Sequence, residues 1–176
     1  MRILKVLVSI VVVLLVAFAV MYAMGSALPT EHVTTIATTM PASQERVWQM
    51  ITDMKSQPGW RTGLKGVEPW PSTDGKECWL EVQNGMKMPL CADLSEPPVK
   101  RVVRMADSTL PFSGTWTYEL QPKSATETTL SITEQASTRT PMWRFVGHYV
   151  IGEDTAIKQY ESDLKKALTT QSSPAS

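Results

Sequence analysis

The sequence predicts an α+β protein, with an antiparallel sheet of about seven strands covered by a long C-terminal helix and preceded by one N-terminal transmembrane helix. Three observations lead to this fold class. The chain opens on a charge-free apolar stretch, continues with short strand-like segments separated by turn residues, and closes on a helical apolar pattern. A meandering antiparallel sheet must bury one face, and the closing helix is the natural cover.

Residues 1–28 are expected to form a membrane anchor. Val6–Met24 contains no charged side chain and would measure about 28 Å as a helix, close to the ~30 Å hydrocarbon core of a bilayer. Arg2 and Lys5 precede this stretch, and the next charged residue is Glu31. The positive-inside rule therefore places the N-terminus in the cytoplasm and the rest of the chain on the periplasmic side of the inner (plasma) membrane.

Two other interpretations of this segment stay open. A cleaved signal peptide has the same flanking charge, and Gly25-Ser26-Ala27 provides small residues for a peptidase, but its apolar region is usually only about 7–15 residues long. A buried core helix is disfavoured because the segment has no polar face. Both membrane interpretations export the remainder, which we divide into a linker at 29–31 and one folded domain at 32–168.

Composition excludes several classes of protein. The chain has 176 residues with 17 basic and 17 acidic side chains. Since two of the basic residues belong to the anchor, the exported part has 15 basic and 17 acidic side chains, a net charge of about −2. This balance excludes a generic electrostatic nucleic-acid binder, which carries a basic excess. Two cysteines exclude an all-cysteine zinc site.

Local patterns define the first elements of the exported domain. Glu31–Met40 alternates and is rich in β-branched residues, which predicts a strand. Ser43 is the expected N-cap of a helix, and Pro58-Gly59 ends a following turn or short helix. The apolar stripe of that first helix is Val47, Trp48, Met50 and Ile51. Six further strands, separated by turn residues, are expected at 64–70, 76–83, 87–94, 99–106, 112–121 and 128–137.

The closing helix is expected to begin after Thr140, with Pro141 at its first position. Its apolar face consists of Met142, Phe145, Tyr149, Ala156, Tyr160, Leu164 and Ala167. Gly147 and Gly152 weaken its first half, so we expect a kink or split near Gly152. Residues 169–176 form a polar tail that is expected to be disordered.

Three groups of residues resemble one known superfamily. They are Pro41-Ala42-Ser43 with Val47-Trp48, Asp53, Pro58 and Trp60; Gly114–Leu120 with Leu130–Glu134; and Tyr160 with Leu164–Leu168. Over residues 32–168 the pattern is similar to the SRPBCC (START-like) superfamily, in its polyketide cyclase/dehydrase and lipid-transport branch. The resemblance implies a helix-grip fold, in which a curved antiparallel sheet wraps around a long helix with an apolar cavity between them. It implies no single activity, because the superfamily includes lipid carriers, hormone receptors and cyclases.

The two cysteines are expected to form a disulfide. If Asn84-Gly85 is a two-residue hairpin loop, the numbers of paired residues sum to 169, and Cys78 lies directly opposite Cys91. At a non-hydrogen-bonded pair the Cα atoms are about 4.5 Å apart, which suits a disulfide. In an oxidising exported compartment a structural disulfide is favoured over a pair of free packed thiols or a redox-active pair.

Aromatic residues supply the candidate ligand-binding cavity. Most of the six tryptophans are expected to be ordinary core residues. Alternation in 112–120 places Phe112, Gly114, Trp116, Tyr118 and Leu120 on one face of their strand, toward the closing helix. The expected cavity residues are Met105, Trp116 and Tyr118 on the sheet, with Phe145 and Tyr149 opposite them on the helix.

No catalytic or metal-binding pattern emerges. His32 and His148 have no ligand spacing, and there is neither a phosphate-binding glycine loop nor a nucleophile turn, so we predict no catalytic set, metal or cofactor. Glu81, Arg104 and Glu134 are either polar groups inside the cavity or members of solvated strand faces, and the second interpretation is favoured.

These features favour a membrane-tethered, non-catalytic protein that binds or transports a hydrophobic ligand or lipid, which would enter beneath the closing helix near Gly147–Gly152. Two alternatives stay open. One is a polyketide cyclase/dehydrase-like enzyme, which would use a tyrosine, glutamate or arginine of the cavity as acid or base. The other is an interaction module whose cavity is filled by its own side chains.

Overall fold

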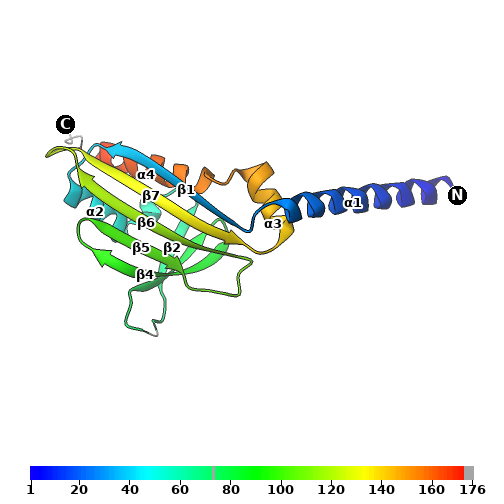
Figure 1. Ribbon diagram of the computed structural model, residues 1–176, viewed down its shortest axis with the longest axis horizontal. Helices are drawn as coiled ribbons and strands as arrows, with labels where there is room; N and C mark the ends of the chain where they lie inside the picture. The colour runs from blue at the N-terminus through cyan, green and yellow to red at the C-terminus, as the bar shows by residue number, and fades with distance from the viewer. Residues whose placement is uncertain (73, 173–176) are drawn as a thin grey trace.

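The structure is a computed structural model that describes residues 1–72 and 74–172. Its centre is one antiparallel sheet with the strand order β1-β7-β6-β5-β4-β3-β2 (Figure 1). The strands are β1 (Glu31–Met40), β2 (Leu64–Pro69), β3 (Cys78–Gln83), β4 (Met86–Glu96), β5 (Lys100–Met105), β6 (Phe112–Pro122) and β7 (Thr128–Thr138). The helices are α1 (Arg2–Ala27), α2 (Gln44–Thr52), the short 3₁₀ turn η1 (Gln57–Gly59), α3 (Pro141–Val146), the π-helical turn η2 (Gly147–Ile151) and α4 (Thr155–Ser172). The predicted α+β fold class is confirmed.

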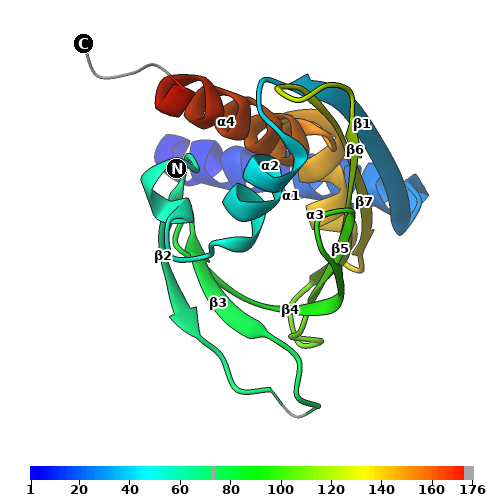
Figure 2. The same cartoon turned by 90° about the vertical axis from the view of Figure 1, so that its left-hand side faces the viewer.

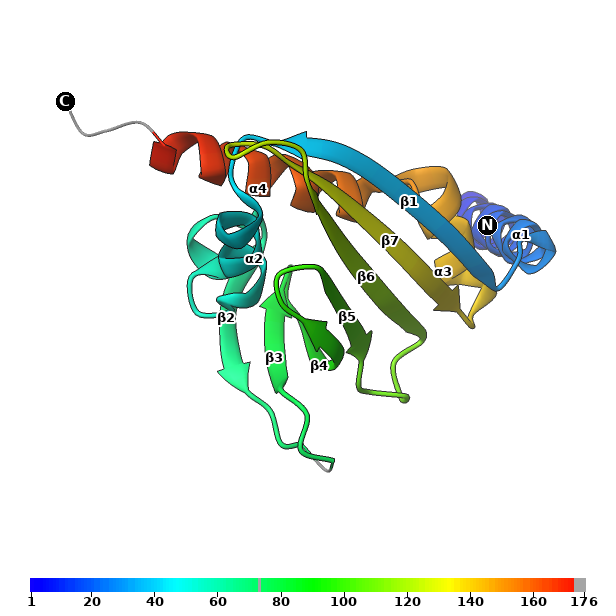
Figure 3. The ribbon, with the colours of Figure 1, turned by 60° about the vertical axis from the view of Figure 1, so that its left-hand side comes forward.

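The sheet curves around α2 and α4, so that one of its faces turns inward (Figures 2 and 3). This inner face carries two apolar clusters. The first joins α2 and α4 to β1, β6 and β7, and its buried residues include Val47 and Leu130. The second lies on β3, β4 and β5 and includes Trp79 and Val103. Tyr118 of β6 packs against both clusters and marks the boundary between them.

The β3–β4 hairpin has the predicted register. Asn84 and Gly85 have positive φ angles of 50° and 82°, the backbone conformation that a two-residue hairpin loop of this type requires. This turn places Cys78 directly opposite Cys91. Their Cα atoms are 4.1 Å apart and their sulfur atoms are bonded, so the predicted disulfide is confirmed.

The closing helix is divided, as expected, near Gly152. This residue has a φ of 89°, which a residue with a side chain rarely adopts, and it separates η2 from α4. The end of α4 differs from the expectation, because residues 169–172 are helical instead of part of a disordered tail. The buried Leu168 keeps this end of α4 on the core, and the remaining tail residues, 173–176, lie outside the described part of the chain.

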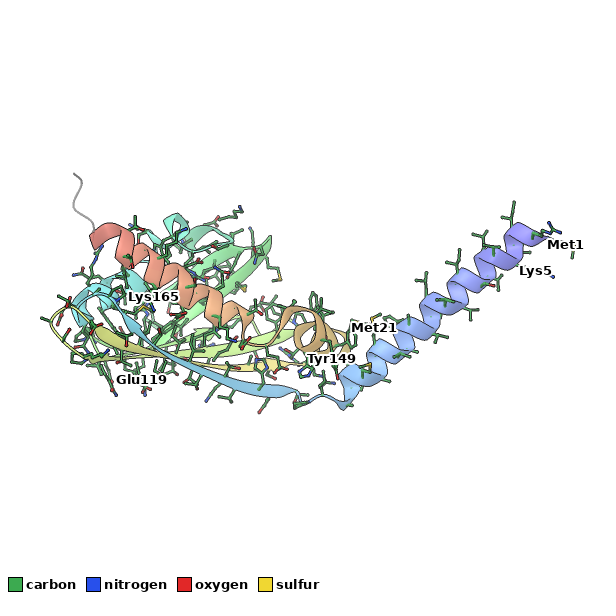
Figure 4. All side chains as sticks on the ribbon, turned by 90° about the horizontal axis from the view of Figure 1, so that it is seen from above. Met1, Lys5, Met21, Glu119, Tyr149 and Lys165 are labelled. Atoms are coloured by element: carbon green, nitrogen blue, oxygen red, sulfur yellow. A yellow bond between two sulfur atoms is a disulfide. The ribbon has the colours of Figure 1, made fainter. Side chains whose placement is uncertain are left out.

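Helix α1 projects from one end of the domain (Figures 1 and 4). It is long and apolar enough to cross a membrane, and its most apolar stretch is not buried against the domain. Its last turns pack on α3, where Gly25 is buried and a Cβ atom would overlap the carbonyl oxygen of Pro141. The Arg144 side chain donates a hydrogen bond from Nε to the Gly25 carbonyl oxygen at 2.9 Å. The end of α1 is therefore held by specific contacts with α3.

Candidate ligand-binding cavity

A cavity of about 620 Å³ lies between the inner face of the sheet and α4. Its size falls within the roughly 300–1,000 Å³ of small-molecule sites in proteins. Most of its lining is apolar and comes from β3, β4, β5, β6, β7 and the start of α4. Representative lining residues are Met88, Leu90, Val103, Phe112, Ile132 and Ile157.

Three of the predicted cavity residues, Met105, Trp116 and Tyr118, line this space. Their placement follows from strand alternation, since Trp116 and Tyr118 are two residues apart on β6. The indole ring of Trp116 lies over Gly114, where a Cβ atom would be 3.0 Å from the ring carbon Cη2. A glycine at this position therefore makes room for the ring. Whether these three residues contact a ligand stays a prediction.

Phe145 and Tyr149 are not among the residues that line the cavity, in contrast to the expectation. Their rings contact each other, with centroids 5.1 Å apart, and Phe145 lies beside Gly25 of α1. Tyr149 is 52% exposed. The break at Gly152 is the physical reason: α3 and η2 leave the line of α4 and pack toward α1 (Figure 4).

A buried ion pair occupies one part of the cavity wall. Arg61 makes two parallel hydrogen bonds with the Glu81 carboxylate, Nη1–Oε1 at 2.7 Å and Nη2–Oε2 at 2.9 Å. Arg61 also donates to Gln57 Oε1 at 2.6 Å, and Trp79 Nε1 donates to Glu81 Oε1 at 3.1 Å. Burial lowers the pKa of Arg61, but the charge and hydrogen bonds of Glu81 outweigh it and raise that pKa above its usual value. Glu81 is thus fully paired.

A second carboxylate, Glu134 of β7, is buried, and no cation in the described part of the chain pairs with it. Its residue is 8% exposed and lies directly opposite Trp116 in the β6–β7 register. Burial raises the pKa of Glu134 from 4.5 to about 7, although a hydrogen bond with the Trp116 side chain lowers it in part. Among the described residues, none is hydrogen-bonded to Glu134 Oε2 or to Nε2 of His32, which also lines the cavity.

The favoured interpretation of solvated strand faces is therefore wrong for Glu81 and Glu134. It is correct for Arg104, which lies at the surface and bonds to Asp93 through Nε at 2.9 Å. One signal in the sequence could have found Glu134: it continues the alternation of the buried Leu130 and Ile132 on β7.

Solved structures with the same architecture cover most of this chain. The Zhui aromatase/cyclase from Streptomyces sp. R1128 has a TM-score of 0.67 at 12% identity, covering 82% of this chain and 97% of its own. Norcoclaurine synthase from Thalictrum flavum has a TM-score of 0.62 at 11% identity, covering 81% and 97%. A START superfamily protein from Mycobacterium smegmatis has a TM-score of 0.59 at 14% identity, covering 80% and 99%.

The chain has the helix-grip fold of the SRPBCC (START-like) proteins. This confirms the resemblance seen in the sequence at the level of the fold. No protein-family model matches the chain, and no curated protein matches it. Identities this low support no statement about activity.

Within this helix-grip cavity, two tyrosines lie near the ion pair. Tyr118 and Tyr160 have ring centroids 5.6 Å apart, and Arg61 lies 5.1 Å from the centroid of the Tyr160 ring. Burial raises the pKa of Tyr118 to about 12 and raises that of Tyr160 well above its usual value. Both phenols therefore stay protonated at neutral pH and can donate hydrogen bonds.

No group of three or more histidine, cysteine, aspartate or glutamate side chains is close enough to hold a metal ion in the part of the chain that the structure describes. His148 lies at the surface, with Nδ1 3.0 Å from Glu153 Oε1. The cavity can thus bury an apolar molecule and offer it a small number of polar contacts.

Proposed function

We propose that the protein binds or transports a hydrophobic ligand or lipid in this cavity, without catalysis, while α1 tethers it to a membrane. The cavity itself is the observation that carries the proposal, because its volume of about 620 Å³ is lined mainly by apolar side chains. Burial would supply the binding energy, at roughly 0.8 kcal/mol for each methylene group removed from water. The interaction module with a filled cavity is less favoured for the same reason.

Two features support the membrane tether: the apolar helix α1 and the disulfide of the domain that follows it. One apolar N-terminal helix fits a single-pass anchor, and the disulfide fits an extracytoplasmic domain. We propose that residues 1–28 are the anchor, 29–31 the linker and 32–168 the periplasmic domain, with the N-terminus in the cytoplasm. Removal of 1–28 as a signal peptide is the alternative, and the mass of the mature protein distinguishes the two.

The position of α3 and η2 suggests how a ligand would enter. A set of exposed apolar residues, here called the membrane-side patch, lies on these two elements next to the end of α1: Trp143, Tyr149, Val150 and Ile151. Tryptophan and tyrosine are enriched at membrane interfaces. Ile151 is 56% exposed and also lines the cavity, as do Gly147 and Gly152. An apolar ligand could therefore pass from the bilayer surface along η2 into the cavity.

Native mass spectrometry of the detergent-extracted full chain tests the binding function. We expect an apolar molecule of defined mass to remain bound. Ala136→Trp places a large side chain inside the cavity and should abolish the bound mass, whereas Gln135→Trp, on the exposed face of the same strand, should keep it. Several preparations with no bound mass, or equal binding by both variants, would contradict the proposal.

A cyclase- or dehydrase-like enzyme is the second candidate, and Glu134 is the observation that favours it. A cavity carboxyl whose pKa is about 7 can both donate and accept a proton near neutral pH. If the protein is such an enzyme, Glu134→Gln should abolish turnover of the bound molecule without releasing it. A bound molecule that is recovered chemically unchanged from the wild-type protein would argue against this candidate.

A further inference from the structure

The inner wall of the cavity has one polar site that the protein itself leaves incomplete. Glu134 Oε2 is buried and has no hydrogen-bond partner among the described residues. A buried polar atom without a partner is unfavourable, and such atoms are rare in native proteins. This oxygen at the wall of the cavity is therefore free to form a hydrogen bond with a molecule bound there.

The other carboxylate of the cavity shows what a completed site looks like. Both oxygens of Glu81 accept hydrogen bonds from Arg61, and Trp79 adds a third. Glu81 consequently has little capacity left for a ligand. Glu134 differs because no arginine or lysine pairs with it in the described part of the chain, and Trp116 is its one hydrogen-bonding neighbour.

A second unpaired atom lies on the same face of the sheet. His32 of β1 pairs with Ala136 of β7, and Glu134 is two residues from Ala136, so all three side chains point to the inner face. His32 Nε2 is buried without a partner, and His32, Glu134 and Ala136 all line the cavity. Phe112 and Trp116 of the neighbouring strand add apolar surface, and the hydroxyl-bearing Thr34 and Thr138 also lie nearby, opposite Glu134 on β1 and in the cavity lining, respectively.

We propose that Glu134 and His32 form the polar anchor of the cavity and that they bind the hydroxyl group of an otherwise apolar alcohol or phenol. This inference rests on the proposed ligand-binding function and names the chemical class of its ligand. The anchor lies on β1 and β7, whereas the Arg61–Glu81 pair lies between η1 and β3. The ligand would thus be oriented with its hydroxyl group toward β1 and β7.

The hydroxyl group follows from the chemistry of the two anchor residues. A hydroxyl donates one hydrogen bond and accepts others, so it can donate to a carboxylate oxygen and accept from an imidazole N–H, or the reverse. Above about pH 7, where Glu134 is ionised, a ligand carboxylate would be repelled by it. An ammonium group would bring a charge into an apolar wall with a single carboxylate to compensate for it.

Displacement of a fluorescent probe tests the inference on the full chain in lipid nanodiscs. The probe is N-phenylnaphthylamine, and the competitors are the isomers undecanol and decyl methyl ether, with undecanoic acid and undecylamine as further arms. The isomers have the same atoms, but the ether cannot donate a hydrogen bond. Wild-type protein should bind undecanol about tenfold more tightly than the ether, as expected for one buried hydrogen bond.

Variants separate the anchor from the rest of the cavity. Glu134→Leu should lose the preference for undecanol, so that undecanol and the ether displace the probe at equal concentrations. Glu119→Leu, which removes an exposed carboxylate from β6, should keep that preference. Comparison of variants in identical nanodiscs cancels the partitioning of the competitors into lipid.

The outcomes distinguish this inference from the function on which it rests. Probe fluorescence no higher than with empty nanodiscs would overturn both the binding function and the anchor. Probe binding with equal affinity for the two isomers, or tighter binding of the acid or the amine than of undecanol, would overturn the hydroxyl anchor alone. A preference that survives in Glu134→Leu would place the polar contact at another residue and overturn the role of Glu134.

Discussion

The buried carboxyl of Glu134 makes the stability of the protein depend on pH in a specific direction. In the unfolded chain Glu134 loses its proton near its ordinary pKa of 4.5, whereas the folded protein keeps that proton up to about pH 7. Between these two values the folded state binds more protons than the unfolded state. The free energy of unfolding therefore falls as the pH rises through this window. Glu134→Gln, which is neutral throughout, removes this contribution.

The size of the effect follows from the two pKa values. A rise from 4.5 to about 7 corresponds to about 3 kcal/mol, at about 1.4 kcal/mol per pKa unit. Glu134→Gln and wild type should therefore differ little at pH 4.5, and the variant should be more stable by about 3 kcal/mol at pH 8. With a urea dependence of about 2 kcal/mol per molar, its unfolding midpoint at pH 8 should be about 1.5 M higher.

Tryptophan fluorescence during urea unfolding measures this difference in the full chain, because all six tryptophans lie after residue 28. His32 lines the same cavity and is the other residue of the proposed anchor. The comparison is therefore repeated in a His32→Gln background, where the effect of Glu134→Gln should persist. Parallel pH profiles for the wild type and Glu134→Gln would refute the assignment of a buried neutral carboxyl.

Three further predictions concern the packing of the domain. Arg61→Met leaves the Glu81 carboxylate buried without its cation and should lower the free energy of unfolding by about 3–5 kcal/mol. Adding Glu81→Met should restore most of that loss in the same urea titration, and a double variant as unstable as the single one would contradict the pairing. Gly25→Ala should separate α1 from α3 and speed proteinase K cleavage between α1 and β1. Gly147→Ala is the control and should leave the cleavage rate unchanged, because there is open space around its new Cβ atom. Equal cleavage rates for the two variants would disprove the close contact between α1 and α3. Replacing both cysteines by alanine should lower the free energy of unfolding by about 3 kcal/mol, and thiol labelling of the unreduced wild-type protein would show that the disulfide is absent.

Local signals predicted much of the fold because each acts within a few residues. Ser43 accepts a hydrogen bond from the backbone N–H of Arg46, as an N-cap should. Asn84-Gly85 adopts the positive φ angles of a tight hairpin. Since the turn of a hairpin sets which residues pair, that one dipeptide also placed Cys78 opposite Cys91, its disulfide partner thirteen residues further along the chain. The sheet face carrying Trp116 followed from alternation alone.

The candidate site was harder to predict, because its residues meet only after folding. The helical pattern that joined Phe145 and Tyr149 to α4 ignored the change of direction at Gly152. On the N-terminal side of this break, Phe145 packs beside Gly25 of α1 and Tyr149 is exposed. The sequence alone favours a solvated face for Glu81, because its partner, Arg61, is twenty residues away along the chain. A charged side chain on a strand is usually exposed, and only tertiary contacts show the exceptions.

By itself, the sequence determined the apolar N-terminal helix, the order of the elements and the hairpin register, all of which depend on periodicity, capping and turn chemistry along the chain. The helix-grip class followed from the resemblance to the SRPBCC superfamily. The tertiary structure alone decided which polar groups lie in the cavity. Burial sets the pKa of Glu134 and leaves its oxygen without a partner, and burial is a property of how distant strands and helices pack. The same packing holds α1 against α3, because a close backbone approach at Gly25 has no signature within α1 itself.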